Sequence, residues 1–239
     1  MRGLALLAVL VSLGGCGPEP LPPVSAGGVP AAPLPPAALG LPALVIPADN
    51  PVTPAKVALG RKLFFDRRLS PNGTMSCAMC HVPEQGFTAH ELATPVGIEG
   101  RSVRRNAPTV LNVGWQKRLF HDGREVALED QVWGPLLAPN EMGNPSIGYV
   151  IERIRGLEDY RGLFEAAFAG RGPSAARVGA ALASYQRTLV AGDSRFDRWF
   201  FAGDGTTLNA SERAGFELFR GKAGCVACHS ADFQHAPFT

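Results

Sequence analysis

Residues 77–81 read Cys77-Ala78-Met79-Cys80-His81, and the same arrangement returns as Cys225-Val226-Ala227-Cys228-His229. Two cysteines three positions apart, with a histidine directly after them, have the spacing of covalent haem attachment. Each thiol adds to one vinyl group of the haem, and the adjacent imidazole becomes the proximal ligand of the iron. The sequence therefore predicts two c-type haems. Their predicted ligands are Cys77, Cys80 and His81 in the first motif and Cys225, Cys228 and His229 in the second.

Two other uses of paired cysteines are open, a four-cysteine zinc site and two local disulfides. Zinc-ribbon pairs lie about 15–20 residues apart, whereas Cys80 and Cys225 are separated by most of a domain. Local disulfides suit an exported protein. Neither alternative gives a reason for a histidine after both pairs, so the pattern favours haem.

The composition excludes some classes of protein. With 239 residues and 46% hydrophobic content, the chain can bury one or two small cores. A net charge of +2 is too small to indicate a nucleic-acid partner. The 28 glycines and 21 prolines predict long loops between helices.

The first residues read as an export signal. Arg2 precedes an apolar run over residues 4–13 that is too short to span a membrane, which predicts a signal peptide over residues 1–15. Leu13-Gly14-Gly15-Cys16 resembles the bacterial lipobox, so Cys16 is expected to carry the lipid anchor, the chain's only membrane attachment. An ordinary signal peptide with a chance cysteine is the alternative. The expected location is the bacterial periplasm, where c-type haem is attached.

Residues 16–52 are rich in proline and alanine and carry almost no charge, which predicts an extended tether. The folded part is expected to begin at Thr53, which precedes a proline as a helix N-cap does.

Residues 55–64 and 210–219 match at their alanine, glycine, leucine and phenylalanine positions, and each segment leads into one of the two haem motifs. This is an internal repeat of a helix followed by a haem motif. Further helices are expected over residues 146–155, 158–169 and 174–190, and no alternating strand pattern is found. The predicted fold is all-α with two cytochrome c-like haem domains and long loops. The first domain is expected over residues 53–205, and residues 206–239 are expected to be the start of an incomplete second domain.

Several strings resemble the bacterial di-haem cytochrome c peroxidases and their MauG-like relatives. They are Leu59–Asp66, Arg68–Ser70, Arg105–Asn112, Asp122–Arg124, Gln131, Glu141–Met142 and Asp193–Ser194. The resemblance implies that the first haem reacts with peroxide and that the second relays electrons. It implies that Glu141 is the distal acid–base residue with Gln131 near it, whereas most glutamates are solvated surface residues. Asn106 matches a calcium ligand of the family, and capping of a turn is its alternative role.

The chain departs from the family pattern at three places. His121 stands where the family carries a tryptophan between the haems, and a hydrogen-bonded loop histidine is its simpler reading. Ile98 stands where members that need reductive activation have a histidine capping the first iron, and His90 is off register, so an open first haem is expected. The chain ends at Thr239, before the second haem's other axial ligand, which indicates a fragment. Met75, Met79 and Met142 are expected to be packing residues.

The expected function is reduction of hydrogen peroxide to water with electrons from a small periplasmic donor, a cytochrome c or a cupredoxin. The alternatives are MauG-like oxidation of side chains of a partner protein and electron transfer without catalysis. A homodimer stays open.

Overall fold

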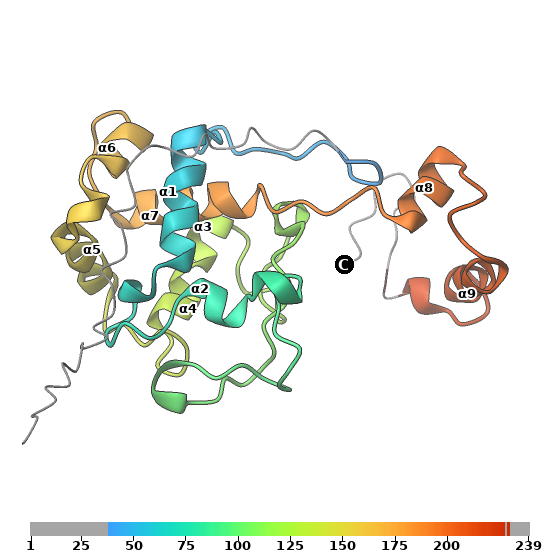
Figure 1. The fold of residues 1–239 in the computed structure, drawn as a ribbon, viewed down its shortest axis with the longest axis horizontal. Helices are drawn as coiled ribbons and strands as arrows, with labels where there is room; N and C mark the ends of the chain where they lie inside the picture. Colours follow the sequence, from blue (N-terminus) through green and yellow to red (C-terminus); the bar gives the residue numbers. More distant parts are fainter. Residues whose placement is uncertain (1–37, 228, 230–239) are drawn as a thin grey trace, which may run out of the picture.

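The computed structural model describes residues 38–227 and 229, which form helices joined by long loops (Figure 1). The α-helices are α1 (Pro54–Phe65), α2 (Cys77–Cys80), α3 (Leu128–Gln131), α4 (Trp133–Leu137), α5 (Ile147–Gly156), α6 (Leu163–Ala167), α7 (Ala175–Gln186), α8 (Arg195–Ala202) and α9 (Ala210–Arg220). The short 3₁₀ turns are η1 (Arg67–Leu69), η2 (Pro83–Gln85), η3 (Ile98–Gly100), η4 (Val113–Trp115), η5 (Glu158–Tyr160) and η6 (Cys225–Ala227). Within these residues, β-structure is limited to three isolated bridges. The all-α prediction is confirmed. The predicted signal peptide and Cys16 lie outside the described residues.

Helices α1 and α7 pack against each other at the centre of the core. Leu59, Leu63 and Phe64 of α1 are buried against a face of α7 that includes Val178 and Leu182. Thr53 caps α1 as predicted, because its hydroxyl accepts a hydrogen bond from the backbone N–H of Lys56.

A glycine allows the two helix backbones to come this close. A β-carbon built on Gly60 would lie 1.9 Å from the backbone oxygen of Ala181, so any side chain at this position would clash. On α7, Gly179 has the same role against α3, because its β-carbon would lie 2.1 Å from the backbone oxygen of Glu129. Helix α3 is therefore seated directly on α7.

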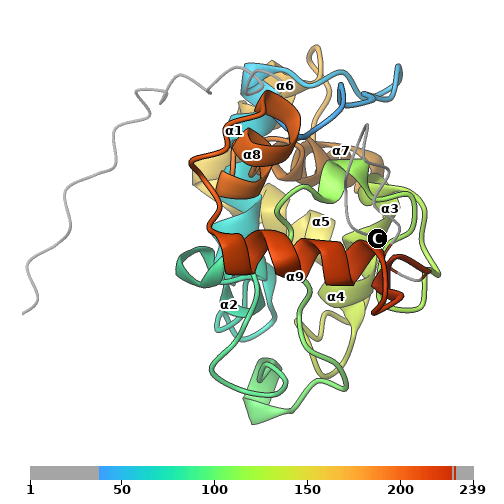
Figure 2. The same cartoon turned by 90° about the vertical axis from the view of Figure 1, so that its right-hand side faces the viewer.

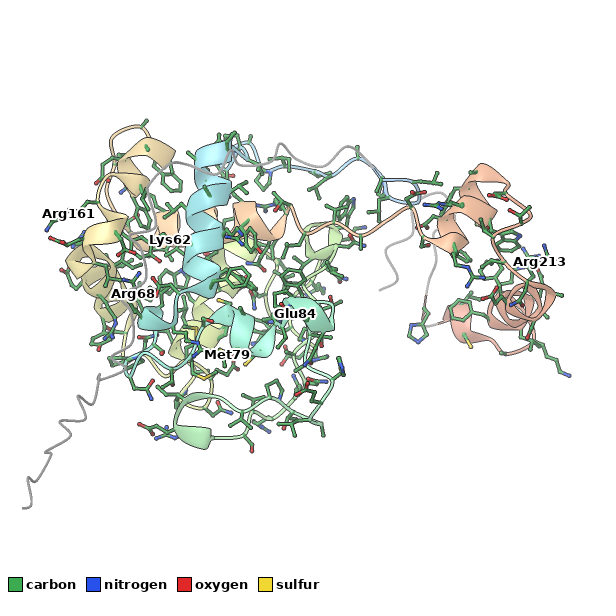
Figure 3. The ribbon with its side chains drawn as sticks, viewed as in Figure 1. Lys62, Arg68, Met79, Glu84, Arg161 and Arg213 are labelled. Atoms are coloured by element: carbon green, nitrogen blue, oxygen red, sulfur yellow. The ribbon has the colours of Figure 1, made fainter. Side chains whose placement is uncertain are left out.

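Helices α5 and α6 complete the core. Helix α5 agrees with the predicted segment and is capped by Ser146. The helix expected over residues 158–169 is instead broken into η5 and α6, because Gly162 between them has a φ of +76°. Figure 3 shows Lys62 and Arg68 near these elements, where both form ion pairs with Asp159 at 2.6 and 2.8 Å.

Residues 38–52 pack along the helical body and the loop that leads to α8 instead of forming a free tether. The indole of Trp115 donates a hydrogen bond to the carbonyl of Pro42 at 3.1 Å, and the backbone N–H of Asp193 donates to Leu39 at 3.0 Å. The Asn50 side chain is 3% exposed and donates to Glu129 at 2.6 Å. A proline-rich segment offers free carbonyl groups, and here they find donors. The folded part thus extends before the boundary expected at Thr53.

Helices α8 and α9 lie together at one end of the molecule, apart from α1–α7 (Figure 1), and they face the viewer in Figure 2. The rings of Phe196 and Trp199 on α8 contact Phe216 on α9 with centroid separations of 5.1 and 5.5 Å. An ion pair of 2.8 Å joins Arg195 to Glu212. Helix α8 therefore packs with the C-terminal unit, although the domain boundary was expected after it, at residue 205.

No helix in the described part of the chain is long and apolar enough to cross a membrane.

Candidate functional site

The first haem motif forms a single helical turn beside a cavity. Cys77 and Cys80 lie at the two ends of α2, and the backbone N–H of His81 closes the turn on the Cys77 carbonyl at 2.9 Å. Residues three apart on a helix share a face, so both thiols and the imidazole line the same cavity of about 490 Å³. This volume lies within the range of cofactor pockets.

The two thiols are free, and both are protonated at neutral pH before they react. Burial raises the pKa of Cys77 to about 12 and that of Cys80 to about 11. The sequence left a local disulfide open, and in the structure both thiols of the first pair are free.

The His81 ring is held in the state that an iron ligand needs. Its Nδ1 lies 3.2 Å from the carbonyl oxygen of Phe87, which can only accept a hydrogen bond, so Nδ1 donates and Nε2 keeps its lone pair. Burial lowers the pKa of His81, which favours the neutral imidazole. The Phe64 ring supports the imidazole at a centroid distance of 6.4 Å.

Glu141 lines the same cavity as the haem motif, from the turn after α4. Its backbone N–H donates to Ala138 at 2.9 Å, and its carbonyl accepts from the N–H of Ile98 at 2.8 Å. The carboxyl group is half-buried, and burial raises its pKa, with partial opposition from Arg124. The charge of Glu141 also contributes to the raised pKa of Cys80, since both groups face one cavity.

Asn144 anchors the turn that carries Glu141. Its side chain is 3% exposed, and its amide nitrogen donates at 2.9 Å to the carbonyls of both Leu69 and Leu136. On the other side, the loop before η3 lies so close that a β-carbon on Gly97 would be 2.1 Å from the Asn140 backbone oxygen. The carboxyl of Glu141 is therefore presented by a turn fixed on two sides.

Gln131 is the last residue of α3, and it also lines the cavity. Two residues earlier, Glu129 forms a bidentate ion pair with Arg187, with N–O distances of 2.6 and 3.2 Å. The Arg187 side chain is 6% exposed. This buried pair fixes α3, and with it Gln131, against the end of α7.

His121 and Asn106 are joined to each other at the cavity wall. The Nε2 of His121 lies 2.9 Å from the backbone carbonyl of Asn106 and donates to it, which agrees with the reading of a hydrogen-bonded loop histidine. The Asn106 side chain donates to Ala89 and accepts from Ala107, both at 2.8 Å. These bonds are those of a turn-capping residue, and calcium binding at Asn106 stays a prediction.

Ile98 and His90 both lie outside the cavity lining. Ile98 is buried against Gly143 and borders a separate hollow, and His90 is exposed. Among the described residues, His81 and His121 are the histidines that line the cavity.

Two of the three methionines expected to be packing residues are buried, and one is exposed. Met75 and Met142 are buried and line the cavity, as packing residues do. Met79 is 39% exposed on the outer side of α2 (Figure 3), so the expectation that it is a packing residue is wrong. The short α2 turn directs both cysteines inward, which leaves Met79 on the solvent side.

The second haem motif repeats the local geometry of the first. Helix α9 leads into η6, which carries Cys225, and the Phe219 and His229 rings lie 6.3 Å apart, close to the Phe64–His81 spacing. His229 is exposed, whereas His81 is half-buried. Cys228 lies outside the described residues.

The sequence reasoning missed the arginines of the cavity wall. Arg104, Arg105 and Arg124 all line it, and Asp122 pairs with the last two at 3.1 and 2.8 Å. Arg105 and Arg124 stand in strings that resemble the family, but no role was assigned to either, and nothing in the sequence separates Arg104 from other loop arginines.

Comparisons with known proteins agree with this geometry. The family described as di-haem cytochrome c peroxidase matches residues 54–206. The methylamine utilization protein MauG of Methylorubrum extorquens is 48% identical over 185 residues, which are 77% of this chain and 52% of that protein. The cytochrome c551 peroxidase of Nitrosomonas europaea is 36% identical over 196 residues, 78% of this chain and 57% of that protein.

Solved structures of MauG-like proteins and di-haem peroxidases superpose on this chain. A MauG-like protein associated with microbial copper homeostasis superposes with a TM-score of 0.71 at 37% identity, over 80% of this chain and 56% of that one. The diheme peroxidase BthA of Burkholderia thailandensis gives 0.67 at 29% identity, over 85% of this chain and 58% of that one.

The chain spans about half the length of the curated relatives it matches. The family's haem c is the cofactor that fits the free thiols, the neutral imidazole and the cavity beside them. On the profile match and these identities, the chain belongs to the di-haem cytochrome c peroxidase family.

Proposed function

We propose that this chain carries the peroxide-reducing site of a di-haem peroxidase. Hydrogen peroxide takes up two protons and two electrons there and leaves as two molecules of water. The observation that carries the proposal is that Glu141, with its raised pKa, and the haem motif of Cys77, Cys80 and His81 line one cavity.

Bound haem supplies the redox chemistry for breaking the peroxide bond. Cys77 and Cys80 would hold the cofactor covalently, and His81 would ligate the iron through Nε2 while the Phe87 carbonyl fixes the ring through Nδ1. The second motif, with Cys225, Cys228 and His229, is proposed to hold a second haem that passes electrons from the donor.

Glu141 moves the proton. A carboxylate oxygen of Glu141 accepts a proton from one oxygen of peroxide and returns it to the other oxygen, which leaves as water. A general acid–base group works best when its pKa lies near the operating pH, and burial shifts Glu141 in that direction. Gln131 offers an amide hydrogen-bond donor on the same cavity wall, which can orient the peroxide.

The position of Ile98 supports an open first iron. Its side chain is buried outside the cavity, so it leaves peroxide access to the first haem without a reductive activation step. The same observation favours a second candidate, MauG-like oxidation of side chains on a partner protein.

The experiment follows the optical spectrum of the full haem-loaded chain after stoichiometric peroxide is added. Glu152, an exposed glutamate on α5, provides the matched control Glu152→Gln. The parent and the control are expected to react rapidly, and Glu141→Gln roughly 10²–10⁴-fold more slowly. Equal rates for Glu141→Gln and the parent would remove Glu141 from the mechanism. If the parent does not react with peroxide, electron transfer without catalysis is the function that remains.

We further propose an exported protein of the bacterial periplasm, anchored through lipid on Cys16. The proposed electron donor is a small cytochrome c or cupredoxin, with calcium at Asn106 and a homodimer as further proposals. Metabolic labelling with a fatty acid tests the anchor. The label is expected on the parent and is expected to disappear in Cys16→Ala.

A further inference from the structure

The wall of the first haem cavity carries an excess of positive charge. Arg104, Arg105 and Arg124 line it, and Asp122 pairs with Arg105 at 3.1 Å and with Arg124 at 2.8 Å. The hydrogen bond from Arg105, followed by that from Arg124, holds the pKa of Asp122 below its usual range, so this carboxylate is ionised. Three positive charges and one negative charge leave +2 in this cluster. An ionised Glu141 on the same wall would still leave an excess of +1.

Arg104 stands out among the arginines. Within residues 38–227 it is the one arginine whose guanidinium group has no hydrogen bond, ion pair or ring contact. The arginines nearest to it in the sequence all have hydrogen-bonding or ion-pair partners. Arg101 pairs with Glu99, Arg105 pairs with Asp122, and Arg118 donates to the Gly123 carbonyl at 3.2 Å.

The chemistry of haem supplies the missing partner. A haem carries two propionate groups on the edge of the ring opposite the vinyl carbons to which the cysteines bond. Their two negative charges match the +2 of the arginine cluster. A guanidinium group binds a carboxylate through two parallel hydrogen bonds, the geometry in which arginine surpasses lysine.

We propose that Arg104 binds a propionate carboxylate of the first haem, and that the Arg105–Asp122–Arg124 cluster neutralises the other. The inference shares with the proposed function a haem at the first motif, but it does not depend on peroxide chemistry. Arg104 is a positioning residue here, since it acts on the iron through the cofactor's edge. Its charge makes the ferric state less favourable and therefore raises the reduction potential of the first haem.

The test is a spectroelectrochemical titration of the full haem-loaded chain at several pH values, without peroxide. The variants are Arg104→Gln, Arg104→Lys and the matched control Arg118→Gln, because Arg118 is exposed on a neighbouring loop outside the cavity lining. The second haem serves as the internal reference.

In Arg104→Gln we expect the first haem's potential to fall and to become more strongly dependent on pH, because an unpaired propionate then titrates. Arg104→Lys is expected to restore most of the potential, and Arg118→Gln is expected to match the parent. If Arg104→Gln fails to fold, Arg104→Lys decides through the propionate bending band in resonance Raman spectra, which must shift when the bidentate contact is lost.

Potentials and pH profiles equal to the parent in Arg104→Gln would overturn the proposal. An unchanged potential together with weakened binding of an acidic donor protein would also overturn it, and would assign Arg104 to a docking surface. A parent that does not react with peroxide, with the potential shifts as expected, would contradict the proposed function but leave this assignment standing.

Discussion

Replacing Arg187 by methionine should destabilise the protein far more than breaking an ion pair on its surface. Arg187 forms a bidentate pair with Glu129 at 2.6 and 3.2 Å, and the two side chains are 6% and 22% exposed. Methionine keeps most of the volume of the arginine stem but removes the charge, which leaves the Glu129 carboxylate buried without its main partner.

The size of the stability loss depends on the contacts that Glu129 keeps in the variant. Breaking a buried pair costs about 3–5 kcal/mol. Two features place Arg187→Met at the lower end, about 3 kcal/mol. Glu129 keeps the hydrogen bond from Asn50 at 2.6 Å, and the Nε of Arg187 is already buried without a partner.

The assay is urea unfolding of the full haem-loaded chain, followed by far-ultraviolet circular dichroism and by haem absorbance. The control is Arg155→Met, which breaks the exposed Arg155–Glu152 pair and should cost less than about 1 kcal/mol. The double variant Glu129→Gln/Arg187→Met should regain part of the lost stability, because no unpaired charge remains buried. Equal losses for Arg187→Met and Arg155→Met would refute the reasoning.

The Glu129–Arg187 pair also determines how the stability of the protein changes at acid pH. Burial raises the pKa of Glu129, but the hydrogen bonds from Arg187 and Asn50 outweigh it, and the folded-state pKa is lowered below 4.5. A depressed carboxyl pKa adds stability above the unfolded-state value, and this stability is lost as the pH falls through the folded-state value. Arg187→Met should therefore flatten the loss of stability of the parent below about pH 4.5.

Three further predictions concern the core and the Glu141 turn. Gly60→Ala should destabilise the protein by about 1–3 kcal/mol, because the new β-carbon would meet the Ala181 backbone. Gly215 is the equivalent position of the repeat and has open space around it, so Gly215→Ala should stabilise α9 by about 0.5–1 kcal/mol. Urea unfolding measures both changes. Asn144→Ala should slow the peroxide reaction and shift its pH profile because the Glu141 turn loses two anchors, and an unchanged profile would contradict this. Glu141→Gln should be more stable than the parent at neutral pH. A raised carboxyl pKa adds stability below the unfolded-state pKa, and this stability is lost as the pH rises through the folded-state pKa. Equal unfolding free energies of the two proteins from pH 4 to 8 would contradict this.

Local chemistry explains which parts of the fold the sequence could predict. Thr53 accepts the capping hydrogen bond expected of it, and Ser146 and Ser174 cap the helices expected to begin there, because a cap depends on only a few neighbouring residues. The helix expected over residues 158–169 was wrong in its middle, since apolar periodicity does not register the positive φ of Gly162.

The candidate site was predictable only where a motif marked it. Cys77, Cys80 and His81 follow from spacing alone, and Glu141 was singled out by resemblance. The partnerless state of Arg104 and the double anchor of Asn144 depend on contacts between segments distant in sequence. No pattern along the chain encodes such contacts.

The segment of residues 38–52 has a mechanical consequence. Its contacts lie in series along the chain, from Leu39 at Asp193, through Pro42 at Trp115, to Asn50 at Glu129. A pull from the N-terminal side would load these contacts one at a time, as in peeling, so each would yield at low force. The contacts of residues 38–52 would break before the tension reached α1. The geometry around Cys77 and His81 would therefore be protected from a force applied on the N-terminal side.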